Sequence, residues 1–180
     1  MKHRILLVTL IMFVSCTDDY TPKPKAFIKL DFPGKVYEKL DVDCPFIFEF
    51  PVYSQPLKKE DNCSMELSFP LQDGVLHMSY YRIKNDILEL IDDSRKRTYH
   101  HNLVGEGSIS NSSLDAHGMF YDFGQGSAKA AQFYLTDSVN HFFFGALYFK
   151  TEVCDSILPI NIFLKNDILH LIKTFRWKDK

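Results

Sequence analysis

The spacing of apolar residues changes several times along this chain, and each spacing predicts a different element. Residues 5–14 form an apolar run that only Thr9 interrupts. The run is shorter than the roughly 20 apolar residues that a membrane-spanning helix needs. A basic head, Met1-Lys2-His3-Arg4, precedes it, and Ser15-Cys16 follows it. This order is typical of a secretory signal peptide.

Alternation of apolar and polar positions predicts strands in two groups. The first group comprises residues 26–32, 44–50, 65–69 and 75–83, and the second comprises 107–112, 116–123, 130–135 and 141–150. Phe46, Phe48 and Phe50, for example, share one face of their strand. Residues 142–149 are apolar on both faces, which is typical of a strand at the centre of a sheet. Residues 51–62 are expected to form a loop.

Two stretches carry apolar residues at helical spacing. The first begins at Asp86, which with Glu89 has the spacing of a capping box, and is expected to continue to about Asn102. The second begins near Ser156, a candidate N-cap, with Pro159 in its first turn. Its apolar stripe comprises Ile160, Leu164, Ile168, Leu171 and Phe175.

The order of these elements predicts one α+β domain. Strands, a helix, further strands and a closing helix, joined by short connections, favour a mostly antiparallel sheet covered by two main helices, similar to an α/β/α sandwich. Residues 1–15 are then the signal peptide, residues 16–25 a polar tether with two prolines, and residues 26–180 the domain.

Cys16 indicates which class of signal peptide this is. Phe13-Val14-Ser15-Cys16 resembles the bacterial lipobox, although Phe13 departs from the usual Leu. In that motif the cysteine sulfur receives a diacylglycerol and becomes the new N-terminus. Each buried CH₂ adds about 0.8 kcal/mol, and durable anchoring takes more than one acyl chain. We therefore expect Cys16 to be lipidated and the chain to be held at a membrane surface.

Composition and charge narrow the function classes. The chain contains 16 Phe and 9 Tyr among 46% hydrophobic residues, so a packed core is expected and extensive disorder is not. The formal charge is −2, and it becomes more negative when the leader with Lys2 and Arg4 is removed. This mild acidity argues against a nucleic-acid partner, which usually binds a basic face.

The three cysteines after Cys16 allow three disulfide pairings, each with one thiol left over. The pairing of Cys44 with Cys63 is favoured because it closes a short loop rich in turn residues, which would add about 3 kcal/mol on the chain-entropy model. The alternative is that Cys44, Cys63 and Cys154 are all reduced. No Cys-x-x-Cys sequence supports a redox pair or a zinc knuckle.

Motifs for catalysis or metal binding are weak. His100 and His101 are adjacent and would point to different faces of a helix, and the other histidines lie in separate elements without metalloprotease spacing. Ser108 lacks the Gly-x-Ser-x-Gly context of a nucleophile elbow, and residues 124–127 lack the lysine of a phosphate-binding loop. We expect no catalytic residues, no cofactor and no metal, and hence a protein that is not an enzyme.

Several stretches together resemble one known family. They are Tyr20-Thr21-Pro22-Lys23-Pro24, residues 27–33, Asp93-Ser94-Arg95, residues 132–142 and Ala146-Leu147-Tyr148-Phe149, together with the closing helix. The block Phe-Tyr-Leu-Thr-Asp-Ser-Val-Asn-His-Phe at 133–142 is the most specific of them. The chain resembles the gliding-motility lipoprotein family GldD from the signal peptide to nearly the last residue.

The resemblance implies a cell-envelope lipoprotein required for gliding and associated with the type IX secretion machinery. It implies protein partners in that machinery, a lipid anchor in a membrane and a domain that faces the periplasm. The family has no assigned reaction, so no catalytic residues are carried over. An alternative is an envelope lipoprotein whose domain binds a small lipid or glycan in an aromatic-lined cleft. Ser138 and Ser156 lie in Asp-Ser-aliphatic sequences that are similar to O-glycosylation sequons of the same bacterial group.

Overall fold

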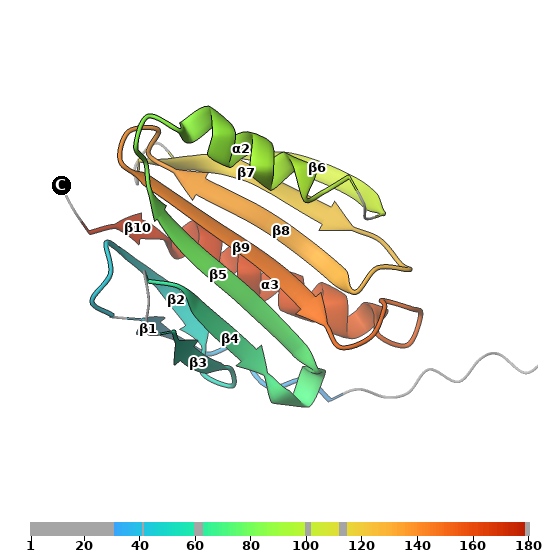
Figure 1. The fold of residues 1–180 in the computed structure, drawn as a ribbon. Coiled ribbons are helices and arrows are strands. Elements are labelled where there is room, and N and C mark those ends of the chain that lie inside the picture. Colours follow the sequence, from blue (N-terminus) through green and yellow to red (C-terminus); the bar gives the residue numbers. More distant parts are fainter. Residues whose placement is uncertain (1–30, 41, 60–62, 100–101, 112–114, 179–180) are drawn as a thin grey trace, which may run out of the picture.

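A seven-stranded antiparallel sheet forms the middle layer of the computed structural model, which describes residues 31–40, 42–59, 63–99, 102–111 and 115–178 (Figure 1). Its strand order is β3-β4-β5-β9-β8-β7-β6. The strands are β3 (Gln55–Lys58), β4 (Met65–Phe69), β5 (Gly74–Arg82), β6 (Leu103–Asn111), β7 (Ala116–Phe123), β8 (Lys129–Thr136) and β9 (His141–Phe149). A short 3₁₀ helix, η1 (Pro70–Gln72), joins β4 to β5.

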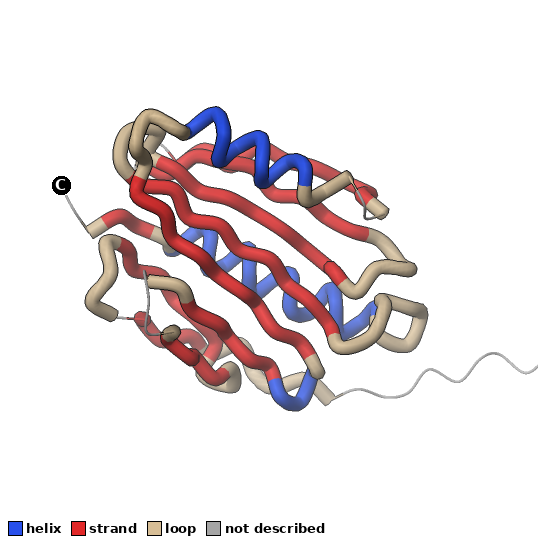
Figure 2. The backbone as a smooth tube through the Cα atoms, in the orientation of Figure 1, coloured by secondary structure: helices blue, strands red, loops and turns tan. Residues whose placement is uncertain are grey.

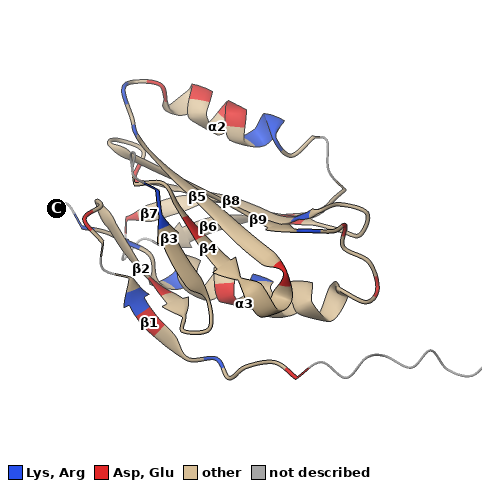
Figure 3. Ribbon diagram, turned by 60° about the horizontal axis from the view of Figure 1, so that its bottom comes forward, with Lys and Arg blue, Asp and Glu red and all other residues tan. Residues whose placement is uncertain are grey.

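The two faces of this sheet are covered by different elements (Figures 2 and 3). Helix α2 (Ile87–Lys96) lies on one face. Helix α3 (Leu158–Thr174) lies on the other, beside a three-stranded sheet of β1 (Tyr37–Leu40), β2 (Phe46–Pro51) and β10 (Arg176–Trp177). The predicted α+β class, with a mostly antiparallel sheet and two main helices, is confirmed.

Strand β9 lies at the centre of the large sheet, as its apolar sequence predicts. It pairs with β5 on one side and β8 on the other, and most of its residues are buried. Gly145 in this strand is covered by the ring of Phe133, since a Cβ placed there would lie 2.4 Å from two ring carbons. The centre of the sheet therefore packs around a position that only glycine fits.

The main core lies between the large sheet, the small sheet and α3. Phe46 on β2 packs against Phe143 of β9 with ring centroids 4.7 Å apart, and Phe143 packs against Phe175 at 5.0 Å. The stripe predicted for the closing helix is buried here, with Leu164, Ile168 and Leu171 all at most 1% exposed. Burial of such side chains stabilises the fold by about 1.5–3 kcal/mol each.

Three short strands were not predicted, and each has a physical reason. Strand β3 lies inside the stretch expected to be a loop, and all four of its residues are exposed, so no alternation marks it. Strands β1 and β10 are short segments whose pairing depends on β2, 125 or more residues from β10 in the sequence. The ends of the other predicted strands agree with the structure to within a few residues where they are described, except at the start of β6.

Helix α2 begins directly after Asp86 as predicted, but the capping bond expected there is absent, and the start of α3 differs from the prediction. Asp86 precedes α2 but caps no helix N–H, because its Oδ1 accepts the backbone N–H of Lys84 at 2.7 Å. Helix α2 ends at Lys96 rather than near Asn102, and β6 begins at Leu103. Ser156 is not the cap of α3 either, since its hydroxyl lies 3.1 Å from the sulfur of Cys154 and the helix begins after Ile157.

The leader, Cys16, the tether and most of the strand predicted at 26–32 lie outside the described residues. Asp31 and Phe32, the two described residues of that stretch, are not in a strand. Within the described ranges, no helix combines the length and the apolar character needed to cross a bilayer.

Candidate functional site

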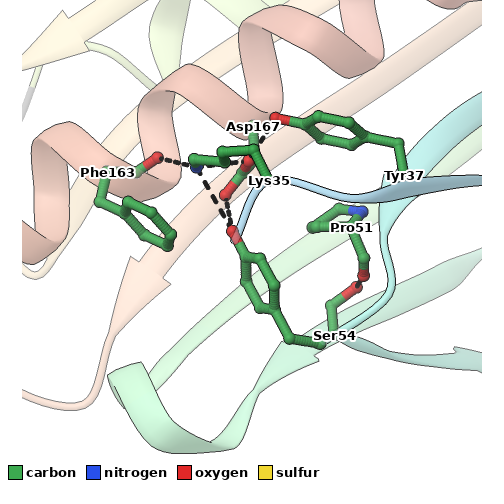
Figure 4. Close-up of polar contacts among 7 residues, drawn as sticks. Lys35, Tyr37, Pro51, Ser54, Phe163 and Asp167 are labelled. Atoms are coloured by element: carbon green, nitrogen blue, oxygen red, sulfur yellow. Dashed lines mark hydrogen bonds and ion pairs between the residues drawn. The ribbon is translucent and has the colours of Figure 1, made fainter. Parts of the chain in front are cut away.

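A polar cluster on α3 holds the segment that leads from the predicted anchor (Figure 4). The carboxylate of Asp167 is 1% exposed. Its Oδ1 accepts hydrogen bonds from Lys35 Nζ at 2.5 Å and from the Tyr37 hydroxyl at 2.8 Å, and Oδ2 accepts the hydroxyl of Tyr53. Lys35 also donates to the carbonyl of Phe163 at 2.9 Å. Three donors therefore satisfy this buried carboxylate, as the burial of such a group requires.

The cluster changes the acid–base behaviour of its donors. Burial raises the pKa of the Tyr37 and Tyr53 hydroxyls, and the bonded Asp167 carboxylate raises both further. Burial lowers the pKa of Lys35, while Asp167 opposes that change. Both tyrosines therefore act as donors at neutral pH, which is the role that the geometry gives them.

Aromatic contacts extend this attachment in both directions along α3. The ring of Phe32 stacks on Phe163 with centroids 4.3 Å apart. The ring of Tyr37 stacks on His170 at 3.7 Å, and His170 Nε2 lies 2.7 Å from a carboxylate oxygen of Glu49 on β2. Residues 32–37 are thus held on the helix along about two turns. Any chain that precedes residue 31 starts from a fixed position on the domain.

That position lies at one end of the large sheet. Phe163 contacts Tyr53, which contacts Phe69 at the end of β4, and Phe69 is paired with Gly74 at the start of β5. Strand β5 then runs to Arg82, eight residues away, so its far end is roughly 27 Å from Gly74. We call the end of the sheet next to residues 32–37 the tether end, and the opposite end the distal end.

A polar pocket of about 530 Å³ lies at the distal end, where the two sheets meet. Arg82 of β5 is paired directly with His141 of β9, so both side chains project from the same face. The hydroxyl of Tyr80 lies 2.8 Å from His141 Nδ1, and the His141 ring stacks on Trp177 at 4.9 Å. The remaining lining residues are Asp43, Cys44, Pro45, Asn140 and Lys178.

The disulfide of Cys44 and Cys63 borders this pocket. The structure joins the two residues with their Cα atoms 5.8 Å apart, which is the pairing favoured from the sequence. The bond connects the loop before β2 to the chain just before β4, and so links the small sheet to the large one. Cys154 is a free, exposed thiol.

A second hollow, of about 400 Å³, lies between α3 and the outer strands of the large sheet. Phe120 and Asp122 of β7 line it from the sheet, and Ile162 and Lys165 line it from the helix. Lys165 and Asp122 form an ion pair across it. Its apolar rim is exposed to solvent, with Val104 67% and Ile162 55% exposed.

The described histidines have separate partners. His77 pairs with Glu66, and His117 lies 2.5 Å from the hydroxyl of Ser138. No group of three His, Cys, Asp or Glu side chains within the described ranges is arranged to hold a metal ion, and His100 and His101 lie outside those ranges. Ser138 and Ser156 are both exposed, on the turn after β8 and in the loop before α3.

Sequence reasoning missed the Asp167 cluster and the distal pocket. The only available signal for the first was an acidic residue between Leu164 and Leu171 on the buried side of an apolar helix. The sequence carried a clearer signal for the distal pocket, because His141 and Asn140 belong to the specific block at 133–142. Asp137 in that block accepts the backbone N–H groups of residues 139, 140 and 141, which fixes the turn beside the pocket.

Comparison with known proteins identifies the family of this chain. No curated protein matches it significantly. The family model described as gliding motility lipoprotein GldD matches residues 17–177, which include every described element of the domain. The match begins directly after Cys16 and ends at Trp177. The chain belongs to the gliding motility lipoprotein GldD family.

Proposed function

We propose that this protein is a membrane-anchored accessory component of gliding motility and of the associated type IX secretion machinery, and that it acts by binding other proteins rather than by catalysis. The family match over residues 17–177 carries this proposal, since it covers both the tether and the whole domain. The lipid on Cys16 would hold the chain at a membrane, with the domain facing the periplasm. The attachment of residues 32–37 to α3 supports it, because the domain then has a defined tether end.

The free edge of β6 is the surface we assign to partner binding. The large sheet has two edges, and β3 at one edge is four residues long with Pro56 and Lys58, which discourage pairing. Strand β6 at the other edge is nine residues long and contains neither Pro nor Lys. Its outer backbone donors and acceptors suit an added strand, and a protein segment is the ligand that satisfies such a row.

The hollow beside α3 gives this edge selectivity. Gly105 is paired with Asp122 and Gly107 with Phe120, so the two glycines face the same side as the lining of the hollow. No atom outside the immediate neighbours lies within 4 Å of a Cβ placed at Gly107. An extended partner segment paired with β6 could place every second side chain in the hollow, against the exposed apolar residues of α3. We therefore propose an extended partner segment with alternating apolar side chains.

A crosslinking pull-down tests the proposal. Full-length protein, carrying an affinity tag in place, is recovered from detergent-solubilised envelopes and its partners are identified by mass spectrometry. Gly107→Lys places a long charged side chain over the hollow and should abolish recovery of motility or secretion components. Leu88→Lys is the control, because Leu88 is 80% exposed and lies on α2, which covers the opposite face of the sheet. Equal recovery by both variants would refute β6 as the surface, and recovery of no such component by the unaltered protein would refute the function.

The hollow also supports a second candidate function, binding of a small lipid or glycan. Phe120 and Phe123 line it, although most of the Phe residues are buried in the core. Native mass spectrometry of the purified full-length protein would reveal a co-purifying lipid or glycan. Loss of that species in Ile162→Lys would place it in the hollow, and its persistence would exclude the site.

A further inference from the structure

The polar pocket at the distal end has the features of a binding site. Its volume of about 530 Å³ lies within the usual range for small-ligand pockets. Three of its lining residues, Tyr80, Arg82 and His141, belong to the central strands β5 and β9, and the others lie in the loops next to these strands and to the small sheet. Side chains that project from paired strands are held in a fixed geometry, which a ligand site requires.

The charge of the pocket is predominantly positive. Arg82 and Lys178 contribute two cationic groups, and Asp43 is the single acidic residue in the lining. Within the described ranges, the guanidinium of Arg82 has no ion pair or hydrogen bond to a side chain. A guanidinium presents several N–H groups in one plane and binds carboxylate or phosphate oxygens through two parallel hydrogen bonds.

Further polar side chains in the pocket surround these cationic groups. His141 is only 8% exposed and is oriented by the hydroxyl of Tyr80 at Nδ1 and by stacking on Trp177. Asn140 and His141 lie at the start of β9, opposite the end of β5, so they approach the same space as Arg82. We propose that this pocket binds a ligand through a carboxylate or phosphate group, with Arg82 as its main contact.

The position of the pocket determines at which end of the domain a bound ligand would lie. It lies at the opposite end of β5 from the attachment of residues 32–37, and on a different part of the molecule from the β6 edge. A bound anion would therefore lie at the end of the domain opposite to that attachment. The proposal is independent of the partner-binding function, and either can fail without the other.

The single tryptophan of the chain makes a direct test available. Trp177 stacks on His141, so its fluorescence and its indole N–H resonance in ¹⁵N NMR report on the pocket. Full-length protein in detergent is titrated with sodium phosphate in one arm and with a peptide bearing a free C-terminal carboxylate in the other. Ionic strength is kept constant with sodium chloride. The arm that saturates at the lower concentration identifies the source of the anion.

Three variants decide the outcome. Arg82→Gln should weaken binding by about tenfold or more, the loss expected when one charge-assisted hydrogen bond is removed. Lys84→Gln removes the same charge from an exposed residue outside the lining and should leave binding unchanged. Lys178→Gln, after the last strand, provides a second pocket variant should Arg82→Gln fail to fold. The absence of a saturable change in both arms, or equal binding by the Arg82, Lys178 and Lys84 variants, would overturn the proposal.

Discussion

Lys35 Nζ lies 2.5 Å from Oδ1 of Asp167, although the two residues are 132 positions apart in the sequence. The carboxylate is 1% exposed and the lysine side chain 31% exposed, so the ion pair is open to solvent on the lysine side only. The same ammonium lies 3.4 Å from the centre of the Phe163 ring. Through this pair the segment leading to the predicted anchor is attached to the helix that covers the core.

Replacement of Asp167 tests how strongly this segment is held. Asp167→Asn preserves the shape of the side chain but removes the charge that accepts bonds from Lys35, Tyr37 and Tyr53. Hydrogen bonds to charged groups contribute about 1.5–3 kcal/mol, so the free energy of unfolding should fall by about 2–3 kcal/mol. Urea denaturation measures the fall. Hydrogen exchange should also become faster at the amide of Val52, which donates to the carbonyl of Val36 in the attached segment.

Asp73→Asn is the matched control for that experiment. Asp73 forms an ion pair with Lys150, and both side chains are more than 60% exposed. Exposed pairs contribute about 0–1 kcal/mol, so this variant should unfold almost like the unaltered protein. If the two variants lose similar stability, the Asp167 cluster is not a structural attachment.

The anchor itself is a prediction from the sequence, and substitution of one residue tests it. Cells expressing the unaltered protein should incorporate labelled palmitate into it, and Cys16→Ala should incorporate none, because the lipobox sulfur is the acceptor. Without the acyl chains the protein should shift from the membrane fraction to the soluble fraction. Cys154→Ala is the control, since that exposed thiol is the other candidate for acylation. Equal label in the unaltered protein and Cys16→Ala would remove the lipoprotein assignment of this residue.

The elements that could be predicted are those in which one face is buried. Strand β9 and helix α3 carry long apolar patterns, and the structure gives both the expected position. Strand β3 could not be found in this way, because an exposed edge strand buries neither face. The end of α2 failed for another reason: the four-residue spacing continues to Tyr99, but Tyr99 is 71% exposed and contributes no burial that would extend the helix.

The sites were harder to predict than the strands. The pairing of Lys35 with Asp167 and of Arg82 with His141 depends on how distant strands and helices are arranged, and no local pattern encodes that arrangement. The disulfide between Cys44 and Cys63 could be predicted only from the short loop that it closes. Where a polar residue interrupts an apolar stripe, as Asp167 does in α3, the sequence does carry a usable signal for a buried polar cluster.

A buried lysine under α2 provides a prediction of pH dependence. Lys129 on β8 is 2% exposed and donates to the carbonyl of Arg97 at 2.8 Å and to Gln132 Oε1 at 3.0 Å. Burial, followed by the nearby charge of Arg97, lowers the pKa of Lys129 to about 8. In the unfolded chain a lysine keeps its proton up to about pH 10.4. Between these values the unfolded state binds more protons, so stability must rise with pH.

The expected rise is up to about 1.4 kcal/mol per pH unit, or about 2 kcal/mol between pH 8 and 9.5. Lys35, whose pKa is also lowered, acts in the same direction, so the contribution of Lys129 has to be isolated by substitution. Lys129→Met removes the titrating group, and the stability difference between the two proteins should then change with pH over this window. Urea denaturation at a series of pH values measures that difference.

The trend should reverse at higher pH, for a reason that the Asp167 cluster supplies. The pKa values of Tyr37 and Tyr53 are raised in the folded state, so these hydroxyls lose their protons first in the unfolded chain. Above about pH 10 unfolding therefore releases protons, and stability falls. The unaltered protein should be most stable between pH 8 and 10, whereas Lys129→Met should show a weaker rise before the same fall. A stability difference that stays constant from pH 7 to 10 would mean that Lys129 titrates as it does in the unfolded chain, and its burial would then have no electrostatic consequence.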